Sequence, residues 1–229
     1  MGVSPGTELE LLVDKPASGG RMIARHAGEV VLLAGGIPGE RVLARVTRAG
    51  RRLAFAETIA VLAPSDDRRE PTGDPACGGC FYAHIAYTRQ IQLKAQIIED
   101  AFIRIGKIPL SDRVAVECAS DRGYRMKARF HVRGGRAGFY REGTHELCDP
   151  RSTAQLLVDS IDAVDLVIST LATRGIAVTS VELTENIAAD QRAVHVDTAP
   201  SDDLAVALSG AVRASGLTGA TARASDGAW

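Results

Sequence analysis

The N-terminal quarter of the chain alternates apolar and polar residues in short runs that are broken by glycine. Residues 6–63 contain runs such as TELELLVDKP, EVVLLAGG and RVLARVTRAG. A period of two places successive side chains on opposite faces of a strand. The dipeptides Ala27-Gly28, Gly35-Gly36 and Ala49-Gly50 are suited to the positive φ angles of tight corners. Short strands at this close spacing predict a small all-β barrel that ends near residue 63.

A polar connection and a helix follow the barrel. The segment PSDDRREPTGDPACGGC has almost no large apolar residue, which predicts a surface linker. Residues 87–106 then place apolar side chains at steps of three and four, and Gly106 ends the run. This spacing predicts an amphipathic helix. Its apolar positions are Ile91, Ala95, Ile98, Phe102 and Ile105.

The remainder of the chain mixes strand and helix patterns. Residues 114–148 return to strand character, with Gly134-Gly135 as a hairpin turn. Residues 152–174 predict a helix that opens on a Ser or Thr cap. The predicted elements that follow are strands at 178–186 and 192–198, and a helix at 201–216 capped by Ser201.

This order of elements predicts two domains joined by a linker. Residues 1–63 form the β-barrel, residues 64–84 carry the CGGC linker, and residues 85–229 form an α+β domain. The fold class is therefore a β-barrel followed by an α+β domain.

The charge is distributed unevenly along the chain. Residues 1–149 hold 22 Lys+Arg and 18 Asp+Glu, whereas residues 150–229 hold 5 and 10. A basic half favours a polyanionic partner, although a solvated surface gives the same counts. No apolar run reaches the length of a membrane helix and no secretion signal precedes the barrel, so we expect a cytoplasmic protein without a membrane partner.

Four cysteines leave several chemistries open. Cys77, Cys80, Cys118 and Cys148 lie in a chain without a secretion signal, which argues against a disulfide framework. A zinc site would need a second ligand pair, and His84 is a lone nearby histidine. A redox pair would need the CGGC motif at a helix start behind a buried strand. A metal, a cluster or buried thiols remain.

Several segments together resemble a known family. SGGRMIARHAGEVVLLAGGIPGE resembles the start of a TRAM domain, an oligonucleotide-binding-type barrel. CGGC, YRMKARFHV and GFYREGTHELCD, in that order, are similar to the S-adenosylmethionine-dependent RNA uracil-5-methyltransferases. The resemblance implies an RNA-binding barrel and a central domain that binds and orients structured rRNA or tRNA, in an enzyme of rRNA processing or RNA methylation.

The same resemblance places catalysis elsewhere. In the family the catalytic cysteine, the carboxylate and the S-adenosylmethionine site lie in a C-terminal Rossmann-like domain. That domain would open with a Phe-Phe-Gln-x-Asn segment, which these residues lack. We therefore predict no catalytic or cofactor-binding residue here, and no methyl transfer by the chain alone.

One strand carries the predicted RNA contacts. In YRMKARFH, alternation would place Arg125, Lys127, Arg129 and His131 on one side over a floor of Met126, Ala128 and Phe130. Basic side chains beside stacking aromatics suit looped or single-stranded RNA, whereas a solvated strand face is the plainer alternative. The predicted RNA-binding residues are Tyr124, Arg125, Lys127, Arg129, His131, Arg133 and Arg141.

The family resemblance also bears on the cysteines. Many members hold an iron–sulfur cluster through C-x5-C-x2-C and a later fourth cysteine, and Cys77 and Cys80 match the second and third positions. Pro71 stands at the first position and Thr153 at the fourth, with Cys148 five residues early. We expect these residual metal positions to hold no complete cluster unless Cys118 and Cys148 converge on them.

Two other functions stay open. The chain could act as a stand-alone TRAM-containing RNA-binding adaptor without catalysis. It could also be a redox or metal module built around CGGC, which stoichiometric zinc or iron would reveal.

Overall fold

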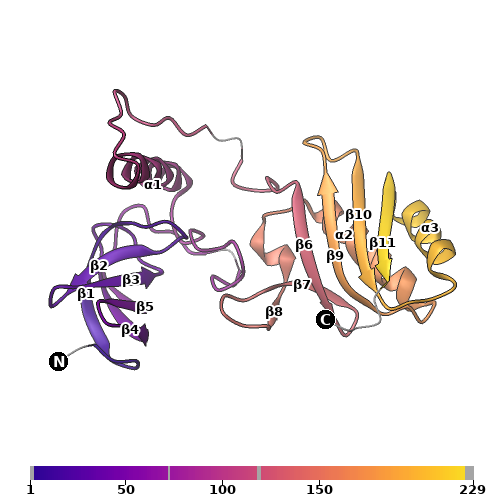
Figure 1. Ribbon diagram of the computed structural model, residues 1–229, viewed down its shortest axis with the longest axis horizontal. Helices are drawn as coiled ribbons and strands as arrows, with labels where there is room; N and C mark the ends of the chain where they lie inside the picture. The colour runs from indigo at the N-terminus through magenta and orange to yellow at the C-terminus, as the bar shows by residue number, and fades with distance from the viewer. Residues whose placement is uncertain (1–2, 72, 118–119, 225–229) are drawn as a thin grey trace. The chain divides into compact units, whose positions relative to one another are not determined.

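The computed structural model describes residues 3–71, 73–117 and 120–224, and the chain divides into two compact units (Figure 1). The first unit comprises Met1–Pro75 and Gly79–Cys118, and the second comprises Ala76–Gly78 and Ala119–Trp229. Sequence reasoning assigned residues 85–118 to the second domain, whereas they lie in the unit that contains the barrel. The short segment around Cys77, in turn, lies in the second unit.

The first unit is built on a closed five-stranded barrel, as the sequence predicted. The strand order is β1-β2-β3-β5-β4, with β3 and β5 parallel and the other pairs antiparallel. Alternate residues of each strand point inward and are fully buried, among them Val13, Val31 and Leu33. The strands are β1 (Glu8–Pro16), β2 (Met22–His26), β3 (Glu29–Ala34), β4 (Arg41–Ala49) and β5 (Leu53–Ala63).

Glycine is required at two of the predicted barrel corners. Gly28 and Gly35 have φ angles of 83° and 80°, which residues with a Cβ rarely adopt. At Gly36 a Cβ would lie 2.9 Å from Leu33 Cδ2 and 3.0 Å from Val13 Cγ2. The pair Gly35-Gly36 therefore combines a left-handed turn with close packing against the barrel core.

A buried ion pair holds the start of the linker on the barrel. Glu40, in the PGE motif, is completely buried, and Arg68 donates to both its carboxylate oxygens at 2.7 and 2.6 Å. The backbone amides of Ile37 and Ser65 donate to the same carboxylate. Burial would raise the pKa of Glu40, but these hydrogen bonds and the Arg68 charge hold it below its ordinary value.

The predicted helix packs on the barrel by a different side chain from those expected. Helix α1 (Tyr87–Asp100) continues into one π-helical turn, η1 (Ala101–Ile105). Leu93 is buried within the barrel core cluster, whereas Phe102 and Ile105 on the predicted apolar stripe are 43% and 69% exposed. The periodicity predicted the helix, but contact with the barrel selected the face.

The second unit is a six-stranded sheet in the order β11-β10-β9-β6-β7-β8. The predicted hairpin turn at Gly134-Gly135 is confirmed, with both residues at positive φ. The predicted strand at residues 114–117 does not form, and part of that segment lies outside the described residues. The strands are β6 (Lys127–Arg133), β7 (Arg136–Tyr140), β8 (Leu147–Cys148), β9 (Val178–Glu185), β10 (Arg192–Thr198) and β11 (Gly219–Ala224).

Two helices contact this sheet on one face, α2 (Val158–Ala172) through β7 and β9 and α3 (Leu204–Ser215) through β11 (Figure 1). Both helices start later than predicted: α2 follows a 3-10 turn, η2 (Pro150–Thr153), and its cap residue is Leu157. The predicted Ser201 cap is also wrong, because Asp203 precedes α3. Strand β11 was not predicted, since GATARA offers little side-chain signal and forms by pairing parallel to β10.

Within the described residues, no helix is long and apolar enough to cross a membrane.

Candidate RNA-binding surface

Strand β6 has the alternation that the sequence predicted, but only from Lys127 onward. Lys127 and Arg129 are exposed, while Ala128 and Phe130 are buried towards the helices. Arg125 lies on the other side: its guanidinium is 5.3 Å from the Phe139 ring centroid, and that ring stacks on Phe130. The prediction that Arg125 shares a face with Lys127 and Arg129 is therefore wrong.

The reason lies in the point where the strand begins. Arg125 precedes β6, and its Nη1 donates to Gln155 Oε1 at 2.8 Å. Met126, predicted as part of an apolar floor, is 46% exposed. Because regular pairing begins at Lys127, alternation counted backward from the strand does not hold for these two residues.

Two of the three exposed cations of β6, Lys127 and Arg129, are already paired with carboxylates across the sheet. Lys127 Nζ lies 2.8 Å from Glu182 Oε1, and Arg129 Nη2 lies 3.1 Å from Asp197 Oδ2. Cross-strand ion pairs of this kind neutralise charge that would otherwise attract phosphate. The strand face is thus less positive than its sequence suggests.

Asp197 on β10 is the centre of this network. Ser180 Oγ donates to it at 2.7 Å, and Arg223 on β11 lies 2.8 Å from its other oxygen. Burial would raise the pKa of Asp197, but the Ser180 and Arg223 hydrogen bonds and the nearby guanidinium charges hold it below its ordinary value. Arg129 and Arg223 are thus held in place by one carboxylate.

At the β7 side of the same face, aromatic rings replace ion pairs. The His131 ring stacks on Tyr140 with centroids 3.7 Å apart and planes at 11°, and His145 meets Tyr140 edge-on at 5.2 Å. The Arg133 guanidinium lies 5.7 Å from the Tyr140 centroid. Burial lowers the pKa of His131, and the charges of Arg129, Arg133 and His145 lower it further. The lowered pKa favours a neutral ring at neutral pH.

A groove of about 670 Å³ lies beside this stack. Arg133 and Arg136 line it, and neither pairs with a carboxylate among the described residues. Cations next to ring faces are suited to unpaired nucleotides. The groove is lined by Arg133, Arg136, Ala137, Thr144, His145, Glu146, Leu147, Cys148 and Asp149.

The remaining predicted residues lie around this groove or away from it. Arg141 is near the groove but pairs with Glu146 at 3.3 Å, and Tyr124 is half-exposed and precedes β6. Sequence reasoning did not include Asp197, Arg223 or His145 in the surface. His145 follows β7 in a loop, and the acidic partner lies on a strand far along the chain, so local alternation gave no signal for either.

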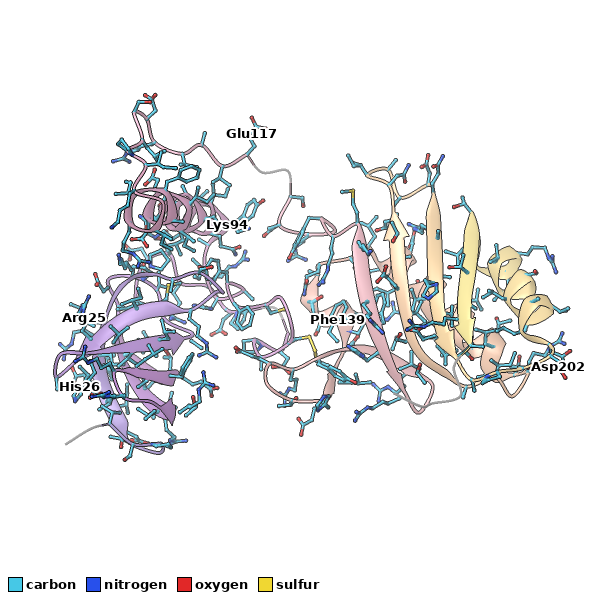
Figure 2. The ribbon with its side chains drawn as sticks, viewed as in Figure 1. Arg25, His26, Lys94, Glu117, Phe139 and Asp202 are labelled. Atoms are coloured by element: carbon cyan, nitrogen blue, oxygen red, sulfur yellow. A yellow bond between two sulfur atoms is a disulfide. The ribbon has the colours of Figure 1, made fainter. Side chains whose placement is uncertain are left out.

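The cysteines form an arrangement that the sequence analysis argued against. Cys77 and Cys148 are joined in a disulfide, drawn as a yellow bond in Figure 2. Cys148 is therefore not a free thiol, which was one of the alternatives that the sequence left open. Backbone hydrogen bonds from Gly78 N to Tyr140 O and from Glu142 N to Ala76 O reinforce the link. The segment Ala76–Gly78 is thus held against β7 by covalent and hydrogen bonds.

This chemistry does not fit a four-thiolate cluster. Two of the sulfurs are bonded to each other, and Thr153 donates its hydroxyl proton to Pro150 O within η2. Cys80 is buried, and Cys118 lies outside the described residues. Among the described residues no group of three or more His, Cys, Asp or Glu is arranged to hold a metal. Cys77 and Cys80 as residual metal positions stay a prediction that this geometry does not support.

His84, considered as a nearby ligand, has a structural role. Its ring is buried in the first unit, and Nε2 lies 3.2 Å from Gly36 O. Burial lowers its pKa, so the ring is neutral near pH 7. The histidine therefore contributes a hydrogen bond to the glycine corner.

The described residues hold one parallel β-α-β unit, β10-α3-β11. The connection from β10 to α3 reads APSDD and contains no glycine. A nucleotide-binding turn of this type needs glycine where backbone approaches the ligand, so this unit does not fit S-adenosylmethionine in that way.

Comparisons with known proteins identify what these two units resemble. Residues 2–59 match the family model of the TRAM domain. The chain is 33% identical over 149 residues to an uncharacterised RNA methyltransferase of Thermosynechococcus vestitus, covering 62% of this chain and 33% of that protein.

A second relative has a more specific name. It is the 23S rRNA (uracil(1939)-C(5))-methyltransferase of Bordetella avium, which is 35% identical over 139 residues, or 57% of this chain and 29% of that protein. The N-terminal barrel therefore matches the TRAM domain model, and the chain is similar to a protein named as an RNA uracil-C5 methyltransferase. The chain spans about a third of the length of these curated relatives.

A solved structure shares the fold. The tRNA (uracil-54, C5)-methyltransferase of Pyrococcus abyssi, solved with S-adenosyl-L-homocysteine, superposes with a TM-score of 0.59 over 84% of this chain and 46% of that one. The sequences are 17% identical, so the likeness concerns the fold alone.

Proposed function

We propose that these residues are the N-terminal, RNA-binding portion of an RNA uracil-C5 methyltransferase that acts on rRNA or tRNA. The observation that carries the proposal is the TRAM barrel in a chain whose relatives are named RNA methyltransferases. The substrate assignment comes from those relatives' names, which include a 23S rRNA enzyme.

The geometry of the second unit supports an RNA-binding role. The His131–Tyr140 stack offers ring faces, and Arg133 and Arg136 line the adjoining groove. Protein recognition of RNA mostly targets unstacked bases in loops, because ring faces and guanidinium groups can stack on them. We therefore assign the groove, rather than the ion-paired part of β6, as the RNA contact of this unit.

Methyl transfer would require a further domain. Attack on a uracil needs a thiolate beside a bound methyl donor, and among the described cysteines Cys77 and Cys148 are bonded to each other and Cys80 is buried. S-adenosylmethionine would supply the methyl group from a site outside these residues. The role of this portion is to bind and orient the RNA.

Binding and methylation assays on the 229-residue chain test the proposal. We expect salt-sensitive affinity for a transcript of rRNA or tRNA, and no incorporation of labelled methyl groups from S-adenosylmethionine. Methylation by the chain alone would refute the division of labour. If the chain bound RNA but the gene had a genuine stop after codon 229, the stand-alone adaptor would be favoured.

A further inference from the structure

A second candidate surface lies on the outside of the barrel, where one row of side chains crosses four strands. Ile23 on β2 pairs with Leu32 on β3, Leu32 pairs with Phe55 on β5, and Phe55 pairs with Arg48 on β4. Their neighbours in sequence, such as Ala24 and Ala54, are fully buried, so this row points outward. The three apolar members are half-buried and Arg48 is exposed.

Arg48 lies over the ring of Phe55. Its guanidinium carbon lies 3.9 Å from the Phe55 centroid, and that of Arg21 lies 5.6 Å away. A guanidinium stacked on an aromatic ring at this distance keeps its opposite face available. The Arg48–Phe55 pair is therefore a platform with a positive charge on top.

Further arginines lie around the platform. Arg25 lies two residues along β2 from Ile23, and Figure 2 shows it at the outer edge of the barrel. Arg51 and Arg52 are exposed in the turn between β4 and β5. None of Arg25, Arg48, Arg51 and Arg52 pairs with a carboxylate among the described residues, and Glu29 and Glu57 lie on neighbouring rows.

The arginines of β4 that face β1 are different. Arg41 pairs with Glu10, and Arg45 Nη2 lies 2.8 Å from Glu8 Oε1 across β1 and β4. Arg41 and Arg45 are thus neutralised by β1, whereas Arg48 on the same strand is stacked on Phe55 and has no such partner among the described residues. A positive side with an apolar floor and a stacking platform is the chemistry of single-stranded nucleic-acid binding.

We propose that the barrel binds an unpaired RNA segment on this surface, with one base stacked on Arg48 above Phe55 and the flanking phosphates near Arg25, Arg51 and Arg52. The proposal deepens the proposed function and rests on it. A duplex would not use the platform, because its bases are stacked on each other and its deep groove excludes side chains.

The test measures the anisotropy of a short fluorescent single-stranded RNA titrated with the full 229-residue chain. Arg48→Lys keeps the charge but removes the planar group, and Phe55→Leu keeps apolar bulk but removes the ring. We expect each to weaken binding roughly tenfold, the size of one lost base stack. Arg45→Lys, on the same strand but ion-paired, is the matched control and should bind like the wild type.

Three further results decide between explanations. If Arg48→Lys and Phe55→Leu bind like the wild type while Arg133→Ala weakens binding, the platform is wrong and the proposed function stands. If the wild-type chain binds no RNA, the proposed function itself fails and the platform with it. If both platform variants weaken binding to a blunt RNA duplex as much as to the single strand, the stacking mode is overturned.

Circular dichroism melts accompany each variant, so that a loss of binding is read only from folded protein. Phe55 points outward, and we therefore expect both variants to stay folded. If Phe55→Leu does not fold, Arg48→Lys alone carries the decision.

Discussion

The barrel and the open sheet both present rows of basic side chains, but the two units use them differently. On the sheet, Lys127 and Arg129 are paired with Glu182 and Asp197. On one side of the barrel, Arg48 stacks on a ring and pairs with no carboxylate among the described residues. A basic stripe in the sequence therefore says little about affinity for RNA until its partners are known.

The difference also distinguishes cations that stabilise the fold from cations available to a ligand. Arg68 is held by the buried carboxylate of Glu40, whereas Arg133 lines a groove beside the Tyr140 ring. A guanidinium that already donates to a carboxylate forms a pair with little net positive charge, so its net contribution to phosphate binding is small.

The largest expected effect concerns Arg68, a cation that stabilises the fold. Arg68→Ala leaves Glu40 buried without its main partner and should lower the free energy of unfolding by about 3 kcal/mol at pH 7. The measurement is urea unfolding followed by circular dichroism. Arg45→Ala breaks an exposed pair and should cost less than about 0.5 kcal/mol.

The pH dependence gives the same variant a second readout. In the wild type the pKa of Glu40 lies below its ordinary value, so its stabilisation is complete above that ordinary value and is lost as the pH falls through the native pKa. In Arg68→Ala burial, which raises the pKa of Glu40, is opposed only by the amides of Ile37 and Ser65, so the protonated form is favoured more than in the wild type. The difference in the free energy of unfolding between the wild type and Arg68→Ala should therefore become smaller at low pH. A difference that does not change with pH would contradict the ion-pair explanation.

The next effect concerns the disulfide of the second unit. Cys77→Ser should lower the stability of that unit by roughly 2–4 kcal/mol, because the bond closes a long loop in the unfolded chain. The two cysteines are 71 residues apart in sequence. Thiol titration of the unfolded, unreduced wild type should find two thiols, since two of the four cysteines are bonded. Four titratable thiols would disprove the bond.

A smaller effect is expected when an arginine of the groove is compared with an ion-paired lysine of β6. Arg133→Ala should weaken RNA binding about fivefold, and Lys127→Ala no more than about twofold, because Lys127 already pairs with Glu182. Filter binding at two salt concentrations measures both. Equal losses of RNA affinity in the two variants would show that the ion pairs of the sheet do not weaken its attraction for RNA.

The smallest expected effect is an increase in RNA affinity rather than a loss. Glu182→Gln removes the carboxylate beside Lys127 and should strengthen RNA binding about twofold at low salt, with little change in stability for an exposed pair. The hydrogen bond from Lys127 holds the pKa of Glu182 below its ordinary value, so the carboxylate is charged in these assays. Unchanged affinity would mean that RNA does not approach this part of the face.

Much of the architecture could be predicted from local patterns. The barrel strands, the glycine corners and the hairpin at Gly134-Gly135 follow from period-two alternation and turn chemistry, which act over a few residues. Strand β11 could not be predicted, because GATARA becomes a strand through parallel pairing with β10. The exposed face of α1 was also mispredicted, since periodicity defines a stripe but not the surface against which it packs.

The candidate site was predicted less well, for the same physical reason. Alternation correctly separated Arg129 from Phe130, but it could not show that Asp197 neutralises Arg129 from a strand 68 residues away. The platform at Phe55 was not predicted either, because Arg48 and Phe55 become neighbours only through the pairing of β4 and β5.

The sequence by itself determined that the chain opens with a small barrel, that a polar linker carries CGGC, and that the order of motifs is that of RNA uracil-C5 methyltransferases. These features depend on residues close together in the chain. Only the tertiary structure decided which arginines are neutralised, that Cys77 meets Cys148, and which barrel side stays positive. Those outcomes depend on contacts between distant segments, which strand pairing and packing bring together.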